Sequence, residues 1–167
     1  MANFYTKASF VLPLTSEQAD FALEVLNCIT DAELDFTKKH KNKAGKAYDN
    51  DVYRLAKKFA KTCDDFIQGE FYLGFEYEKF DNDPKGIWIS SDESIDTGEA
   101  AEFCHLILKH FDSDDYVSIE AAHTCSKLRL DAFGGHAAFV TKKGIKYFST
   151  FEWIGRQVNH LNKAKAA

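Results

Sequence analysis

The chain has few of the residues and runs that mark secreted or membrane proteins. It contains 167 residues, two prolines and four cysteines, and no apolar run approaches the roughly 20 residues of a membrane span. The first residues, MANFYTKASFVLPL, lack the cationic start and long apolar run of a signal peptide. The cysteines lie far apart and form no C-x-x-C pair: Cys28, Cys63, Cys104 and Cys125. We therefore expect a cytoplasmic protein with reduced thiols and no membrane contact.

Common catalytic and nucleic-acid-binding motifs are also missing. The sequence has no G-x-G-x-x-G or Walker pattern, no G-x-S-x-G elbow and no zinc-deaminase signature. Calcium binding in the acidic loop near Asp92 is excluded, because Thr97 stands where an EF-hand needs glycine and Phe103 where it needs glutamate. These absences favour a protein that is not an enzyme and that needs no cofactor or metal.

The residues that are present are typical of one globular domain over 1–167, but their charges are segregated. Hydrophobic residues make up 45% and charged residues 28% of the chain. Residues 70–120 hold fourteen acids and three lysines, 38–61 hold nine basic residues and two acids, and 121–167 hold eight basic residues and two acids. Such a chain presents one acidic and one or two basic surfaces, unless folding mixes these segments in space.

Hydrophobic periodicity predicts an alternation of strands and helices. Thr15 and Gln18 form a capping box for the first helix, and Asp96 caps the third. The expected strands are 3–12, 70–80, 86–90, 116–125 and a hairpin over 136–154 turning at Lys143–Gly144; the expected helices are 14–29, 49–67 and, after the Asp96 cap, one through 100–111. Residues 31–50 are expected to be an irregular insertion and 159–167 a frayed tail.

This order predicts an α+β fold with helices on one face of an antiparallel sheet. Its core resembles a ferredoxin-like β-α-β-β-α-β unit, with a helical insertion after the first helix and an extra C-terminal hairpin.

The densest cluster of chemically useful side chains lies in AAHTCSKLRLDAFGGHAAFV, residues 121–140. His123 and Cys125 are spaced to share one face of a strand, yet no second close pair completes a zinc site. A Cys125 nucleophile would need His123 or His136 as its base. Cys125 stands at a strand end, where the alternative is a small buried residue.

Binding is the other interpretation of this connection. Lys127 and Arg129 alternate with leucines, so both charges are expected on one side, able to grip carboxylates or phosphates. The glycine pair is expected to turn the chain sharply, and the alternative is a solvated hairpin edge. The candidate binding residues here are Cys125, Lys127, Arg129, Asp131, Gly134, Gly135 and His136.

Two further groups are candidates for binding. Asp92 and Glu93 belong to the acidic segment, which would suit a basic partner. A basic helix face carries Arg54, Lys57, Lys58 and Lys61, and it offers contacts to nucleic-acid phosphates or is simply solvated.

The run CSKLRLDAFGG, followed by AAFVT and preceded by GIWISSDE, resembles a segment in small accessory proteins of phages and plasmids. In those proteins the run reads Cys-Ser-Lys-Pro-Arg and later Phe-Gly-Gly-Gly, so Leu128 replaces a proline and His136 a third glycine. The likeness covers the C-terminal half of the chain. It implies a mobile-element accessory protein and names no activity.

Three functions follow as hypotheses. The first is a non-enzymatic accessory or inhibitor protein that binds a protein partner, such as a host defence or nucleic-acid-processing complex. The second is a small enzyme or ligand-binding protein built around His123, Cys125 and His136. The third is direct nucleic-acid binding through the basic helix.

Overall fold

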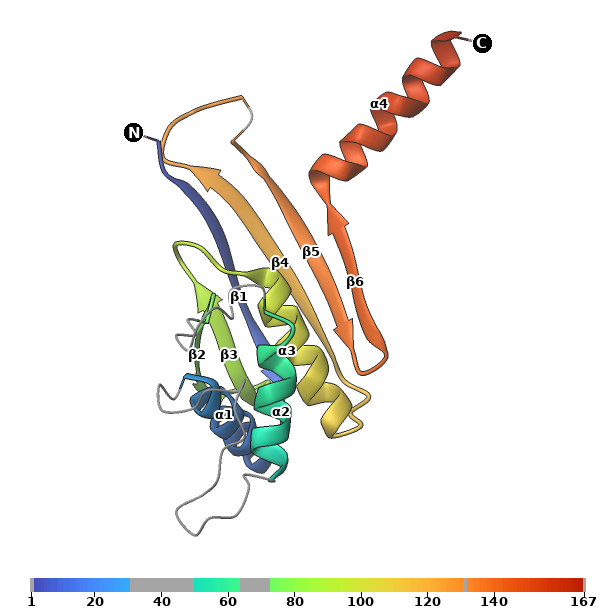
Figure 1. Ribbon diagram of the computed structural model, residues 1–167. Coiled ribbons are helices and arrows are strands. Elements are labelled where there is room, and N and C mark those ends of the chain that lie inside the picture. Colours follow the sequence, from blue (N-terminus) through green and yellow to red (C-terminus); the bar gives the residue numbers. More distant parts are fainter. Residues whose placement is uncertain (1, 31–49, 64–72, 131, 167) are drawn as a thin grey trace.

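A six-stranded antiparallel sheet forms the frame of the protein. The computed structural model describes residues 2–30, 50–63, 73–130 and 132–166 (Figure 1). The strands follow the order β2-β3-β1-β4-β5-β6, and each neighbouring pair is antiparallel. Their bounds are β1 Phe4–Pro13, β2 Glu76–Phe80, β3 Gly86–Ser91, β4 Tyr116–Cys125, β5 Gly134–Thr141 and β6 Gly144–Ser149. The prediction of an α+β fold with an antiparallel sheet is confirmed.

Three of the four helices lie on one face of this sheet, whereas the last one projects from its upper end (Figure 1). The helices are α1 Ser16–Thr30, α2 Asp51–Ala60, α3 Thr97–His110 and α4 Thr150–Ala166. The predicted capping box is present, since the Thr15 amide donates to Gln18 Oε1 at 3.0 Å and the Gln18 amide to Thr15 Oγ1 at 3.3 Å. Asp96 caps α3 as predicted, accepting from the Glu99 amide at 2.9 Å.

The hydrophobic core fills the space between α1–α3 and the sheet. Strand β4 has the predicted bounds 116–125, and Val117, Ile119 and Ala121 are buried on its helix side. Phe103 of α3 is completely buried and lies edge-on to Phe59 of α2, with ring centroids 5.5 Å apart. Helix α3 is the most deeply buried of the helices, as its dense apolar content predicts.

The C-terminal prediction is wrong beyond Ser149. The expected strand over 150–154 and the expected frayed tail are instead the continuous helix α4. Alternating aromatic residues suggested a strand, but Phe151, Ile154, Val158 and Leu161 recur at helical spacing, and that period decides the structure. The hairpin itself is present, with Thr141 paired to Gly144 around the two lysines.

Two other expectations concern the middle of the chain. Helix α2 begins at Asp51, after its cap Asn50, and ends at Ala60, which is shorter than the predicted 49–67. Nearly all of the expected insertion, residues 31–49, lies outside the described residues.

Within the part of the chain that the structure describes, no helix has the length and apolar character needed to cross a membrane.

Candidate functional site

Most candidate residues of the 121–140 stretch meet at the upper end of the sheet, where β1 and β5 begin, β4 ends and α4 follows β6 (Figure 1). The loop after β3 reaches the same end. Its Glu93 carbonyl accepts from the Thr6 amide at 3.0 Å, and the Ile95 amide donates to the Thr6 carbonyl at 2.9 Å. The structure therefore places the acidic Asp92–Glu93 pair at the same end of the sheet, on the other side of β1 from His123.

The two histidines form a hydrogen-bonded pair on the helix side of the sheet. His136 Nδ1 lies 2.8 Å from His123 Nε2, and the ring centroids are 4.8 Å apart. The remaining nitrogens contact hydroxyls: His123 Nδ1 lies 3.2 Å from Thr6 Oγ1, and His136 Nε2 contacts Thr97 Oγ1. A chain of four polar groups thus links β1, β4, β5 and the first turn of α3.

Strand register explains why these histidines meet. His123 lies opposite Gly134, and His136 lies opposite Ala121, so the two rings are diagonal neighbours. A Cβ on Gly134 would make only an ordinary contact with the His123 ring, 4.0 Å from its Cδ2.

The pair accommodates one added proton but not two. With both rings neutral, one proton occupies each of the three contacts in the chain. One imidazolium still donates to its neutral neighbour, whereas two would set N–H against N–H. Burial, and next the charge on His123, lower the pKa of His136 below its ordinary value. The arrangement therefore favours the neutral form of His136.

Cys125 does not join the histidine pair. It lies at the end of β4 opposite Phe4, and the hydrogen bonds described for both imidazoles go to each other and to the two threonines. Among the described residues, no group of three or more His, Cys, Asp or Glu is placed to hold a metal ion. The thiol–imidazole contact required for a Cys-His nucleophile is therefore not formed in the described structure.

The twin glycines do not turn the chain, and this expectation is wrong. Gly134 and Gly135 are the first residues of β5, paired with His123 and Ala122. Their small size matters instead, because a Cβ on Gly135 would lie 2.8 Å from the Ala121 carbonyl oxygen.

Thr150, the first residue of α4, uses this space to anchor the helix. Its Oγ1 accepts from the Gly135 amide and donates to the Gly135 carbonyl, both at 3.0 Å. A Cβ on Gly134 would lie 3.1 Å from the same oxygen. The glycine pair thus fixes the point from which α4 projects.

The connection from β4 to β5 exposes large apolar side chains. Leu128 is 96% exposed and Leu130 is completely exposed. Lys127 and Arg129 alternate with them and are also exposed, and the Arg129 guanidinium lies 5.8 Å from the centroid of the Phe4 ring. Asp131, another candidate residue, lies outside the described residues.

A cavity of about 540 Å³ separates this loop from the start of α4. Leu130 and Phe133 line it from the loop, Phe151 and Ile154 from α4, and His123 from the sheet. Its size is within the range of small-ligand pockets, and most of its lining side chains are apolar.

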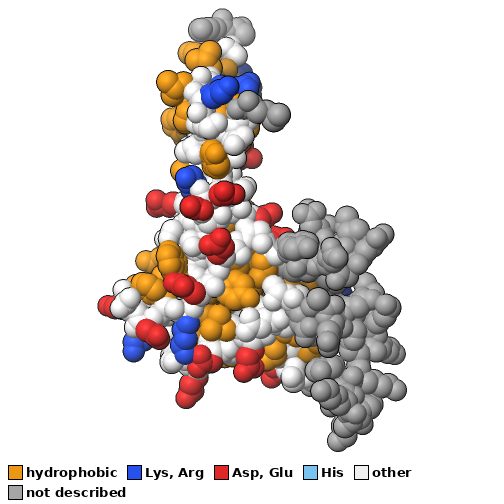
Figure 2. All heavy atoms as spheres, turned by 90° about the vertical axis from the view of Figure 1, so that its left-hand side faces the viewer, with side chains coloured by type: hydrophobic (Ala, Val, Ile, Leu, Met, Phe, Trp, Pro, Cys, Tyr) orange, Lys and Arg blue, Asp and Glu red, His pale blue; other side chains and the backbone are white. Residues whose placement is uncertain are grey.

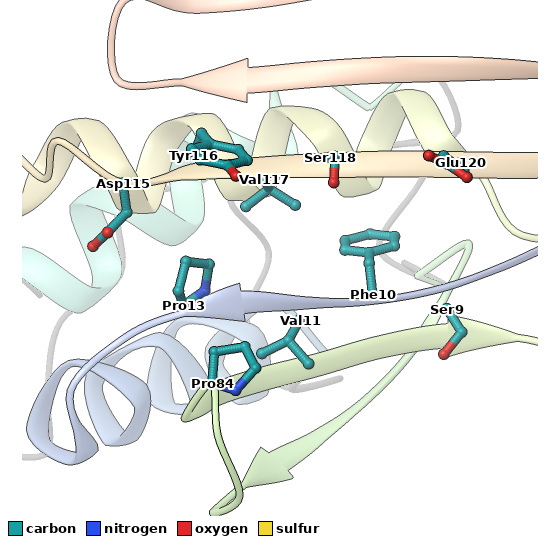
Figure 3. A pocket seen from close by; sticks show the side chains of 10 residues that line it. All are labelled: Ser9, Phe10, Val11, Pro13, Pro84, Asp115, Tyr116, Val117, Ser118 and Glu120. Atoms are coloured by element: carbon teal, nitrogen blue, oxygen red, sulfur yellow. The ribbon is translucent and has the colours of Figure 1, made fainter.

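A second cavity, of about 570 Å³, lies toward the lower ends of β1 and β4 (Figure 3). The ladder between these strands covers only Phe4–Lys7 of β1, and Figure 3 shows the Phe10 ring directed from β1 toward β4 past the end of that ladder. The described lining includes Asp115 and Glu120 but no histidine or cysteine. We therefore assign it no chemistry.

The basic candidates on α2 lie away from this end, on the lower part of the helix-covered face (Figure 1). Arg54 is paired with Asp51 at 2.6 Å, and the Lys57 ammonium lies 6.0 Å from the Tyr53 ring centroid. Lys58 and Lys61 are exposed. The structure does not unite them with the loop residues, so the candidates form two separate groups.

Charge and apolar side chains are distributed unevenly on the side of the molecule seen in Figure 2. Acidic side chains gather on the body below α4, whereas one side of α4 carries a row of hydrophobic side chains.

Sequence reasoning did not identify helix α4, nor Thr6, Thr97 and Thr150. Threonines carry no distinctive spacing, so only the strand register reveals their contacts.

We find no family model, no curated protein and no solved structure that matches this chain.

Proposed function

We propose that this protein is a non-enzymatic binding protein that acts on a protein partner through its upper end. The contact region, called the loop surface below, consists of Lys127–Leu130 and Phe133 with Phe151 and Ile154 of α4. The observation that carries the proposal is the complete exposure of Leu128 and Leu130 beside an open, largely apolar cavity.

Without a partner, the exposed leucine side chains stay in contact with water, which is unfavourable. Burying one leucine side chain contributes about 1.5–3 kcal/mol, so two that stay in water forgo a large part of what an interface can gain. The rim of the loop surface is cationic through Lys127 and Arg129. A partner with an apolar ridge bordered by carboxylates would complement both features.

The remaining parts of the hypothesis belong to the same proposal. The partner would be a component of a host defence or nucleic-acid-processing complex, as an origin in a mobile element implies. The acidic loop at Asp92–Glu93 offers a second contact for a basic region of that complex. From the order of the elements, we also propose that β2-β3-β1-β4 with α1 and α3 is a ferredoxin-like unit. From the thiol content, we propose a cytoplasmic location.

Affinity purification with matched variants tests the proposal. Wild-type protein is expected to recover one stoichiometric partner, and the double variant Leu128→Asp/Leu130→Asp is expected to lose it because two charges replace the apolar contacts. Tyr116→Asp is the control, since Tyr116 is also exposed but lies at the opposite end of β4. Recovery of no partner by the wild type, or equal recovery by the double variant, contradicts the proposal.

A second candidate function rests on the cavity that borders His123. A small ligand there would contact an imidazole, the hydroxyls of Thr124 and Ser149 and several aromatic side chains. If the protein is an enzyme built on Cys125, that thiol reacts rapidly with iodoacetamide and Cys125→Ser abolishes the biological effect. Slow modification together with a fully active Cys125→Ser variant eliminates this alternative.

A further inference from the structure

The chain of polar groups from Thr6 through His123 and His136 to Thr97 is complete in more than one protonation state. With both rings neutral, the three contacts can all donate toward Thr97 or all donate toward Thr6. One added proton also keeps all three contacts, because the charged ring donates to both of its neighbours and the neutral ring donates outward to its threonine. The pair therefore accepts one positive charge without any movement.

A second proton breaks the chain between the two rings. His136 Nδ1 and His123 Nε2 lie 2.8 Å apart, so two imidazolium rings would set two N–H donors and two positive charges against each other. Burial, and next the charge on His123, already lower the pKa of His136. The two rings therefore form one coupled site that binds its protons in two steps.

The surroundings of the pair determine which ring has room to move. Thr97 is buried, with 8% of its surface exposed, and its hydroxyl contacts His136. Movement of His136 would remove the hydrogen bond described for that buried hydroxyl, which is unfavourable. His123 instead lines the cavity of about 540 Å³ between the β4–β5 loop and α4. His123 can therefore turn away from His136 into space that already exists.

The cavity that His123 would enter has no charged side chain in its described lining. Aromatic and aliphatic side chains, hydroxyls and glycines make up the rest of that lining. A charged His123 ring turned into this space would change the cavity from neutral to cationic.

Other titratable groups lie on every segment around the pair except the helix side of β1, where strand alternation places Phe4 and Ala8 beside Thr6. These groups are Cys125 on β4, Tyr147 on β6, Asp96, Glu99 and Glu102 on α3, Asp92 and Glu93 after β3, Lys127 and Arg129 in the β4–β5 loop, Glu152 on α4, and Lys7 and Glu120 on the opposite face of the sheet.

Two of these groups are closest to the pair in the fold. Burial, and next the charges of Glu102 and Asp96, raise the pKa of Tyr147, so this phenol stays neutral where histidines titrate. The Asp96 carboxylate accepts from the Glu99 amide at 2.9 Å, which holds it at the start of α3. The charge that lowers the pKa of His136 is that of His123.

We propose that the histidine pair is a pH switch for this cavity: the first proton leaves the pair closed, and the second turns the charged His123 ring into the cavity. At neutral pH the lining is uncharged and suits apolar groups. In acid it contains a cation, which favours anionic groups. The switch consists of side chains of one molecule, so it does not depend on which partner binds at the loop surface.

Nuclear magnetic resonance of ¹⁵N-labelled histidines from about pH 8 to about pH 4.5 tests the switch. His123 and His136 are expected to titrate in two steps more than about one pH unit apart, the second below the ordinary value of 6.5. The nuclear Overhauser effect between the His123 ring and the Ile154 methyl groups is expected to strengthen only with the second step, because both residues line the cavity. His160 on exposed α4 is the internal reference and should titrate in one step.

Two variants separate the pair from its surroundings. His136→Asn removes one of the two proton sites, so His123 is expected to titrate in a single step and to keep the same signal to Ile154 throughout. His105→Asn is the matched control, because His105 is also half-buried but contacts the Thr141 carbonyl oxygen at 2.7 Å. This control is expected to keep both steps and the change at Ile154.

Three results overturn the inference. Steps separated by about one pH unit or less would show that the rings are not coupled. A signal between His123 and Ile154 that is the same at both ends of the titration would show that the ring stays in place. Loss of the native amide spectrum before the second step would show that acid unfolds the protein instead of moving one ring. The proposed function is tested separately, by Leu128→Asp/Leu130→Asp, and none of these results affects it.

Discussion

The body of this molecule buries its large apolar side chains, whereas the upper end exposes them. Between α1–α3 and the sheet, large side chains such as Phe103, Leu12 and Ile119 are completely buried. At the upper end, Leu128, Leu130 and Phe151 are 85% exposed or more. The difference indicates that the body supplies stability, whereas the upper end leaves large apolar side chains in contact with water.

The largest expected effect comes from the body. Phe103→Ala removes a fully buried ring that packs on Phe59 and Phe75, and we expect it to lower the unfolding free energy by about 3–5 kcal/mol. Urea denaturation measures this loss. A loss below about 1 kcal/mol would mean that the α3 core is loosely packed and that the contrast between the two regions is false.

The junction between the two regions is tested at Gly135. A methyl group there would lie 2.8 Å from the Ala121 carbonyl, so Gly135→Ala is expected to destabilise the fold by about 1–3 kcal/mol. Gly155→Ala is the matched control, because nothing lies within 4 Å of that Cβ. The control is expected to raise α4 helicity by circular dichroism, at a gain of up to about 1 kcal/mol. Equal effects of the two substitutions would contradict the close packing at Gly135.

A smaller effect is expected at the base of α4. Thr150→Val removes the hydroxyl that both accepts from and donates to Gly135, at an expected cost of about 1 kcal/mol. Hydrogen exchange measured by NMR should show faster exchange at the Gly135 amide, with Thr150→Ser restoring protection. Unchanged protection in the valine variant would show that the anchor is not the hydroxyl.

The smallest expected effect is a dependence of the unfolding free energy on pH. Because the folded protein lowers the pKa of His136, the unfolded chain binds more protons as the pH falls below about 6.5, and the native state loses stability there. His136→Asn should flatten the decline in unfolding free energy between pH 6.5 and about 5. His160→Asn, on exposed α4, is the control. A decline as steep in the His136 variant as in wild type would remove the histidine pair as its source.

Local signals predicted much of the body. The Thr15–Gln18 capping box, the Asp96 cap and the strand over 116–125 depend on neighbouring residues, and all are present. The start of α4 was misassigned because aromatic residues such as Phe148 and Phe151 favour strands, so the helical period was overlooked. Strand propensity gave the wrong structure at the start of α4, where Thr150 binds Gly135, fifteen residues earlier in the chain.

The candidate site was predicted only as a list of residues. His123 and His136 were identified, but their contact depends on the β4–β5 register, which places them diagonally across from each other. The glycine pair suggested a turn because glycine is common in turns. Its actual role, space for a neighbouring carbonyl and for Thr150, arises from chain segments that only folding brings together.

The central claim is that Leu128 and Leu130 do not contribute to the free energy of unfolding, and one measurement tests it most directly. Urea unfolding of Leu128→Asp/Leu130→Asp should give a free energy within about 0.5 kcal/mol of wild type, since neither side chain packs against its own chain. A loss of about 2 kcal/mol or more would show that these leucines are buried within the monomer in solution, and the loop surface would not exist as described.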